Sequence, residues 1–140
     1  MKNCYKIEKE KLIVNTHVGN IVFKNLGKFN FKNGLQGKYT EDLKSKGVYC
    51  FVENDTILYV GKTDISLKSR LNGYVKPGIH QATNKRIKDK LSNKKINLYF
   101  LPEKDINQYA DIQNNDEISI NRCIEIIVTG YCWNKNLLNK

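Results

Sequence analysis

Two short apolar and aromatic runs, separated by four polar residues, constrain the fold of this chain more than any other feature. The runs cover residues 47–52 and 57–61, and the polar residues between them are 53–56. β-branched and aromatic runs joined by a short polar turn are typical of a β-hairpin. Gly47 and Gly61 mark the outer ends, where glycine lets another backbone or a phosphate approach closely. The sequence therefore predicts a hairpin at the centre of the fold.

Two tyrosines of this hairpin and an arginine after it form a candidate group for handling phosphate. Tyr49 and Tyr59 lie on opposing strands, so their phenols could meet across the hairpin. A short helix is expected over residues 66–72, with Ser66 as its N-cap and Arg70 beside its apolar side. Taken alone, Arg70 would be an ordinary surface charge of a helix.

The distribution of charge favours an anionic partner. The 140 residues carry a formal net charge of +10, and residues 62–95 hold ten Lys and Arg against two acidic residues. A basic block of this kind is suited to nucleic acid. A lysine-rich composition without any such function is the alternative, and charge alone does not separate the two.

Within the basic block, residues 76–95 are the expected DNA-binding segment. A helix is expected over residues 83–93, with Thr83 as its cap. Its amides are suited to adenine edges and its cations to phosphates, although an ordinary exposed helix would have the same sequence. The candidate DNA-contacting residues are Lys76, His80, Gln81, Asn84, Lys85, Arg86 and Lys88.

The cysteines and the lack of a long apolar run bear on the compartment. Cys4, Cys50, Cys123 and Cys132 include no Cys-x-x-Cys pair, so they match neither a zinc site nor a disulfide framework. A reducing cytoplasm is the simplest inference. No 18-residue apolar run occurs, so neither membrane spanning nor secretion is indicated.

The remaining segments mix strands and helices. Glu125 lies within an amphipathic helix expected over residues 118–129, either as the ion-pair partner of Arg122 or as a ligand for Mg²⁺. The other expectations are strands over 5–32 with a tight turn at Gly19-Asn20, a loop with a helical turn over 33–46, a strand over 96–101 and an acidic surface loop over 103–117.

The order of these residues resembles that of the GIY-YIG nucleases. Residues 47–49 and 59–61 are similar to the two motifs of that family, each with valine in place of isoleucine. Arg70, Tyr74 and Glu125 follow in the family's order, and the resemblance covers roughly residues 46–136.

The resemblance implies a small α/β (α+β) fold, in which a three-stranded antiparallel sheet is flanked by helices. The three strands would be residues 47–52, 57–61 and 96–101. The catalytic domain would then cover residues 46–140, and residues 1–45 would form an N-terminal β-hairpin extension.

The resemblance also implies roles for the site residues. Tyr49 would act as the general base or orient the attacking water, and Tyr59 would position that water or the phosphate. Arg70 would stabilise charge on the phosphoryl oxygens. Glu125 would hold one divalent cation, Mg²⁺ or Mn²⁺.

Three further residues complete the implied site. Tyr74 takes the position at which the family has histidine or tyrosine. Lys62 is placed to bind phosphate or to lower the pKa of a phenol. The terminal asparagine of the family is assigned to Asn134, because it follows Trp133 and a Trp-Asn ending occurs in some members, with Asn136 as the other candidate. Both lie closer to Glu125 than is usual in the family.

The expected function is therefore Mg²⁺-dependent hydrolysis of double-stranded DNA by a sequence-specific restriction endonuclease. A stand-alone phage or mobile-element nuclease, a non-catalytic DNA-binding module and an interaction protein with incidental charge are the alternatives. Cutting both strands with one site per chain would need a homodimer or sequential nicking.

Overall fold

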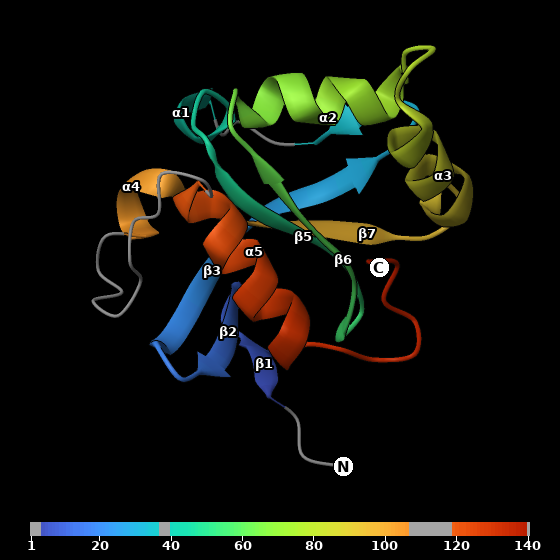
Figure 1. Ribbon diagram of the computed structural model, residues 1–140. Coiled ribbons are helices and arrows are strands. Elements are labelled where there is room, and N and C mark those ends of the chain that lie inside the picture. Colours follow the sequence, from blue (N-terminus) through green and yellow to red (C-terminus); the bar gives the residue numbers. More distant parts are fainter. Residues whose placement is uncertain (1–3, 37–39, 107–118, 140) are drawn as a thin grey trace.

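A curled antiparallel sheet is the centre of the structure (Figure 1). This computed structural model describes residues 4–36, 40–106 and 119–139. Within them the strands pair in the order β1-β2-β3-β7-β5-β6, and β4 pairs with β3. The seven strands are β1 (Tyr5–Glu8), β2 (Lys11–Thr16), β3 (Gly19–Asn30), β4 (Gly34–Leu35), β5 (Gly47–Glu53), β6 (Thr56–Thr63) and β7 (Ile96–Pro102).

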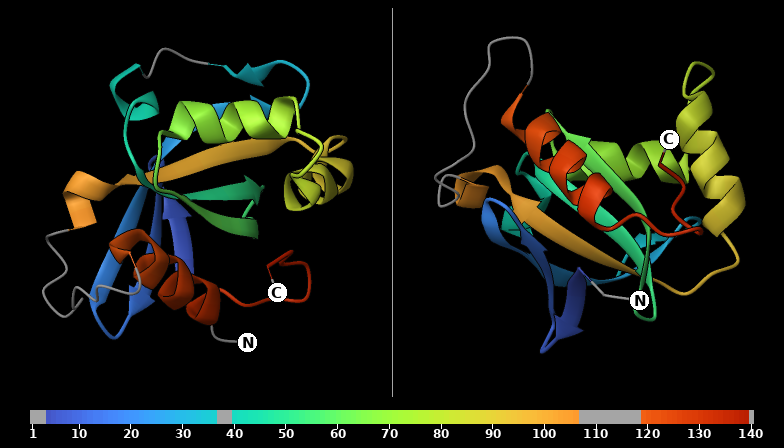
Figure 2. Two further views of the ribbon diagram at one scale, coloured as in Figure 1. Left: turned by 45° about the horizontal axis from the view of Figure 1, so that its top comes forward. Right: turned by 60° about the horizontal axis from the view of Figure 1, so that its bottom comes forward.

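Helices cover both faces of the β5–β6 hairpin. Figure 2 (left) shows the hairpin between α2 and α5. No helix of the described residues combines the length and apolar composition needed to cross a membrane. The five described helices are α1 (Thr40–Leu43), α2 (Leu67–Val75), α3 (Ala82–Leu91), α4 (Glu103–Ile106) and α5 (Ile120–Tyr131).

Alternation along β5 divides its side chains between two hydrophobic cores. Tyr49 packs on the α2 side with Leu71, whereas Cys50 packs on the α5 side with Val128. Both faces of the strand are therefore buried. This explains why the sequence of β5 is almost continuously apolar rather than alternating with polar residues.

The expected three-stranded sheet is wrong. The three expected strands exist as β7, β5 and β6 and are neighbours in that order. However, β3 pairs with the other side of β7, from Lys24 opposite Phe100 to Phe29 opposite Ile96, and β2 and β1 follow beyond it. The N-terminal strands therefore complete the sheet, and Phe23 lies in the same core as the α5 side of β5.

Several local boundaries also differ from the expected ones. Thr16 pairs with Gly19, so the β2–β3 turn lies at residues 17–18 rather than at Gly19-Asn20. The three longer expected helices are present as α2, α3 and α5, with ends shifted by one to three residues. Gln81, not Thr83, is the N-cap of α3. The first residues of the expected acidic loop form α4, and residues 107–117 lie outside the described ones.

Candidate functional site

A cluster of the buried Tyr49 and Tyr74 and the half-buried Arg70, called here the tyrosine–arginine cluster, joins β5 to α2. Arg70 Nε donates a hydrogen bond to Tyr49 Oη at 2.9 Å, and Tyr49 Oη is hydrogen-bonded to Tyr74 Oη at 2.8 Å. The Arg70 guanidinium carbon also lies 5.4 Å from the centre of the Tyr74 ring. Since Arg70 and Tyr74 are four residues apart, they share one side of α2. The structure thus brings three of the expected site residues into direct contact.

Gly61 leaves the space that the Tyr49 ring occupies. The two residues are partners across the hairpin, and a Cβ atom on Gly61 would lie 2.4 Å from both Tyr49 Cζ and Tyr49 Oη. A Cβ atom on Gly47 would similarly lie 2.2 Å from the carbonyl oxygen of Leu101. At Gly47 the close neighbour is therefore another backbone, one of the two partners that the sequence left open, whereas at Gly61 it is the side chain of Tyr49, which is neither of them.

Tyr59 lies beside this cluster without joining its hydrogen bonds. Its ring centre is 6.4 Å from that of Tyr49, and 7% of its surface is exposed. Among the described residues, its hydroxyl has no hydrogen-bond partner. The two hairpin phenols thus approach each other, but only Tyr49 is bonded to Arg70.

Burial makes the two bonded phenols harder to ionise. It raises the pKa of Tyr49 far above the usual value of a phenol, although the nearby charge of Arg70 acts in the opposite direction. Burial also raises the pKa of Tyr74. Tyr49 is therefore neutral near pH 7, and a neutral phenol is the wrong form for the general base that the resemblance implies.

Lys62 contacts an aspartate rather than a phenol. On β6 it is the partner of Val48, which places it on the α5 face, and its ammonium forms an ion pair with Asp64. Although burial acts in the opposite direction, hydrogen bonds from Lys62 and Asn121 keep the pKa of Asp64 below its usual value. Among the described residues, Lys62 therefore stabilises a carboxylate, and it does not contact Tyr49.

Glu125 lies on the other face of the hairpin from Tyr49. Its helix, α5, packs against the core that contains Val48 and Cys50, and 8% of Glu125 is exposed. Its carboxylate forms an ion pair with Arg122, one turn earlier. The ion-pair alternative for Glu125 is therefore the contact observed, and no contact joins it to the tyrosine–arginine cluster among the described residues.

The oxygen atoms on this side of α5 are chemically suited to Mg²⁺. Asn121, one turn before Glu125, is fully buried, and its Oδ1 has no hydrogen-bond partner in the described part of the chain. Mg²⁺ takes a carboxylate together with other oxygen ligands and substrate phosphate. A cation there would compete with Arg122 for Glu125. The described residues contain no group of three or more His, Cys, Asp or Glu side chains that could hold a metal.

Asn134 holds the C-terminal segment against β6. Its Nδ2 donates to the carbonyl oxygen of Ile57 at 3.0 Å. Asn139 bonds both backbone groups of Val60, at 2.8 and 2.6 Å, and the Leu138 N–H donates to the Leu58 carbonyl at 2.8 Å. Neither Asn134 nor Asn136, which is exposed, contacts the tyrosine–arginine cluster. The assigned terminal asparagine is thus used to cover a sheet edge.

Of the seven expected DNA-contacting residues, Asn84 is buried and Arg86 and Lys88 are half-buried. Arg86 donates to the carbonyl oxygen of Leu138 at 3.3 Å, and Lys88 donates to that of Val75 at 2.6 Å. Asn84 is 2% exposed. The residues that remain at the surface are Lys76, His80, Gln81 and Lys85.

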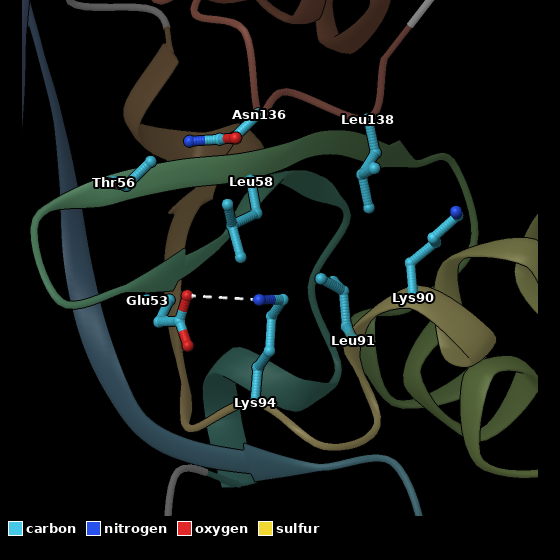
Figure 3. Close-up of a pocket in the computed structure, with 8 residues that line it drawn as sticks. All are labelled: Glu53, Thr56, Leu58, Lys90, Leu91, Lys94, Asn136 and Leu138. Atoms are coloured by element: carbon cyan, nitrogen blue, oxygen red, sulfur yellow. Dashed lines mark ion pairs between the residues drawn. The ribbon is translucent and has the colours of Figure 1, made fainter.

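A pocket of about 240 Å³ lies between β6, α3 and the C-terminal segment (Figure 3). Leu58, Leu91 and Leu138 form its apolar part, and Glu53 and Lys94 face each other across it at 3.6 Å. None of its lining residues belongs to the tyrosine–arginine cluster. The pocket is therefore separate from the expected catalytic residues.

The tyrosine–arginine cluster is chemically suited to an anion. Among the described residues, the terminal Nη groups of Arg70 have no hydrogen-bond partner, and they can form paired bonds with two oxygens of one phosphate.

Comparisons with protein-family models, with curated proteins and with solved structures found no match to this chain.

Proposed function

We propose that this protein is a Mg²⁺-dependent DNA endonuclease of the GIY-YIG type that hydrolyses phosphodiester bonds in double-stranded DNA. The observation that supports this most is the bond from Arg70 to Tyr49, whose ring lies over Gly61. In this contact the arginine meets the tyrosine of the first motif beside the glycine of the second. The basic surface around residues 76–85 favours the same substrate.

Arg70 would bind the phosphate in this proposal. Tyr49 accepts from Nε and so fixes the plane of the guanidinium, while Tyr74 holds Tyr49 from the other side. The Nη groups can then donate to the phosphoryl oxygens, on which negative charge grows during hydrolysis. Tyr49 acts here as a positioning residue. Tyr59, with its unbonded hydroxyl, is the phenol that would contact water or phosphate.

Glu125, with Asn121 Oδ1 as a second oxygen ligand, would hold the cation, and Mg²⁺ when bound would supply charge neutralisation and an acidified water. Both residues lie on the α5 face of the hairpin, away from Arg70 and Tyr49, so a cation there would reach the phosphate that Arg70 binds only after a rearrangement. Homodimers or sequential nicking would account for cutting both strands. Within this class we propose the sequence-specific restriction type. Sequencing the ends of cleaved DNA tests that narrower proposal, because scattered ends would indicate a DNA-degrading enzyme instead.

The test is cleavage of supercoiled plasmid with Mg²⁺ present. Arg70→Ala is expected to lower the rate by about 100-fold, as for the loss of a donor to a developing oxyanion. Lys68→Ala removes an exposed charge from the same helix and should cleave like the wild-type protein. Normal cleavage by Arg70→Ala would overturn the proposal.

A non-catalytic DNA-binding module is the second candidate. The complete burial and neutral state of Tyr49 favour it, because the same contacts would also serve as a structural link between β5 and α2. Binding of DNA that weakens steeply with salt, without cleavage under any divalent cation, would support this module over the endonuclease.

A further inference from the structure

The N-terminus of α3 has no side-chain cap. The helix has ten residues, and its N-cap residue, Gln81, makes no capping hydrogen bond. The first N–H groups of a helix lack partners within it, and together with the helix dipole they favour an anion. The Gln81 carboxamide instead accepts from the Gly78 N–H at 2.8 Å. These backbone donors are therefore available to a ligand.

Asn84, in the first turn of the same helix, has an unsatisfied donor. It is 2% exposed, and its Nδ2 is buried without a hydrogen-bond partner among the described residues. A buried N–H₂ group without an acceptor is costly to folding, so one that persists calls for an explanation. An acceptor oxygen on a ligand would supply it.

Gly73 connects this donor to the surface. A Cβ atom on Gly73 would lie 2.9 Å from Asn84 Nδ2 and 3.5 Å from Gln81 Oε1, so the two amides meet at this glycine. Gly73 and Gln81 line a surface hollow of about 560 Å³. The Asn84 amide therefore lies directly behind Gly73, which lines the hollow, although Asn84 itself is not among the lining residues.

The charge around the hollow is positive. Lys76 is exposed in its wall, and no acidic residue is among those that line it. Lys85 is exposed on the next turn of α3. A ligand here would meet an uncapped helix N-terminus, an amide donor and one or two ammonium groups, which together match the oxygens of a phosphate.

We propose that Asn84, Gly73 and the N-terminus of α3 form a phosphate site that holds a backbone phosphodiester of nucleic acid. Gln81 Oε1, already an acceptor for the Gly78 N–H, marks where a phosphate oxygen would bind once the Gln81 side chain rotates away. Nucleic acid is preferred to free phosphate because the hollow opens within the most basic part of the chain. The inference shares its partner with the proposed function and does not depend on cleavage.

The main test is Asn84→Leu, which removes the donor at nearly constant size. Its free energy of unfolding should be equal to or higher than that of the wild-type protein, because an unsatisfied polar group is lost. Its affinity for a short DNA duplex, measured by fluorescence anisotropy in EDTA, should fall about tenfold, as expected for a hydrogen bond to a charged group. Unchanged affinity in a stable variant would overturn the proposal.

Lys76→Ala is a second variant, chosen because Lys76 is exposed and its truncation leaves the core of the protein intact. Loss of one phosphate contact should reduce the slope of log affinity against log salt by about one, whereas Asn84→Leu should leave that slope unchanged. Lys90→Ala, an exposed charge near the other end of α3, is the matched control. Equal slopes for Lys76→Ala and the control would count against the site.

NMR distinguishes binding of a nucleic-acid phosphodiester from binding of free phosphate. Adding the duplex should shift the backbone N–H signals of Ala82 and Thr83 and the side-chain amide of Asn84. Shifts with inorganic phosphate but not with the duplex would overturn the assignment to nucleic acid, and no shift with either would overturn the site. These binding experiments contain no divalent cation, so their outcome does not depend on cleavage. Failure of the phosphate site can therefore be distinguished from failure of the proposed nuclease function.

Discussion

At Gly61, a hydrogen atom is the only substituent that leaves room for the Tyr49 ring. Gly61→Ala should lower the free energy of unfolding by about 3 kcal/mol, because the new methyl group would overlap a ring that is enclosed by the core. Urea denaturation followed by circular dichroism measures this change.

The matched control for that substitution is Gly130→Ala on α5. No atom of the described residues lies within 4 Å of the position of its Cβ atom, and replacing a helical glycine by alanine stabilises the helix. An increase of about 0.5 kcal/mol is expected. Equal effects of the two substitutions would show that the fit between Gly61 and Tyr49 does not stabilise the hairpin.

Residue contacts could be predicted from the sequence where they are local. Arg70 meets Tyr49 because a hairpin and the helix that follows it have few ways to pack, and the spacing to Tyr74 then places both side chains together. For Lys62 the sequence predicts a phosphate or a phenol as partner, and for Glu125 it leaves an ion pair and a metal open. In the structure each meets an opposite charge close by in the sequence, Asp64 and Arg122. Proximity in sequence favoured the ion pairs.

At the scale of elements, the C-terminal segment acts as a cover for the edge of β6. Asn134 and Asn139 take the place of a neighbouring strand by hydrogen-bonding to backbone groups of β6. Fewer of these groups are then open to pairing with another chain. The double variant Asn134→Ala/Asn139→Ala should lose about 2 kcal/mol of stability, and the Val60 N–H should exchange faster with deuterium.

That variant also tests the catalytic assignment of Asn134. If its role is structural, cleavage per folded molecule should be unchanged, whereas a large loss in a folded variant would restore the catalytic role. Lys135→Ala, an exposed neighbour, should change stability by no more than about 0.5 kcal/mol.

Helix α3 shows what a pattern of charges does not predict, namely which side of a helix packs on the protein. The sequence correctly predicted a helix near residues 83–93, but a run of cations does not show which side of the helix packs on the protein. The short apolar stripe of Ile87 and Leu91 directs one side inward, and Asn84 is buried with it. Arg86 and Lys88 then bind carbonyl oxygens of neighbouring segments.

At the scale of the whole molecule, the sheet depends on a pairing that the sequence did not reveal. β3 and β7 are about seventy residues apart, and β3 contains lysines and asparagines that obscure its apolar alternation. In the sequence, β3 and β7 can each be recognised only as a separate strand. Their pairing depends on contacts that the sequence does not show, namely the edge of β7 and the cores formed with β2 and α5.

Buried acidic protons on both sides of the sheet predict loss of stability in alkali. Burial raises the pKa of Cys132 to about 12 and the pKa values of Cys50, Tyr49 and Tyr74 above their usual range. In the unfolded chain, thiols and phenols lose their protons from roughly pH 8.5 and 10. The unfolded state then binds fewer protons than the native state, so the free energy of unfolding falls as the pH rises.

Denaturation in urea at neutral pH and at increasingly alkaline pH measures this dependence. The contribution of these groups is complete below the pKa values of the unfolded chain and is lost toward those of the folded protein. Cys50→Ala/Cys132→Ala should be less stable at neutral pH but should depend less on pH between about 8.5 and 10. An unchanged slope in that variant would contradict the prediction.

The fit of Tyr49 against Gly61 also has an evolutionary consequence. Because the ring on one strand occupies the space that a side chain on the other would need, position 61 cannot gain a side chain while tyrosine stands at 49. Any related chain that keeps tyrosine at 49 should keep glycine at 61, and one that gains a side chain at 61 should have a smaller residue at 49. The two short motifs of the hairpin would then be inherited as one unit, whether or not Arg70 is inherited with them.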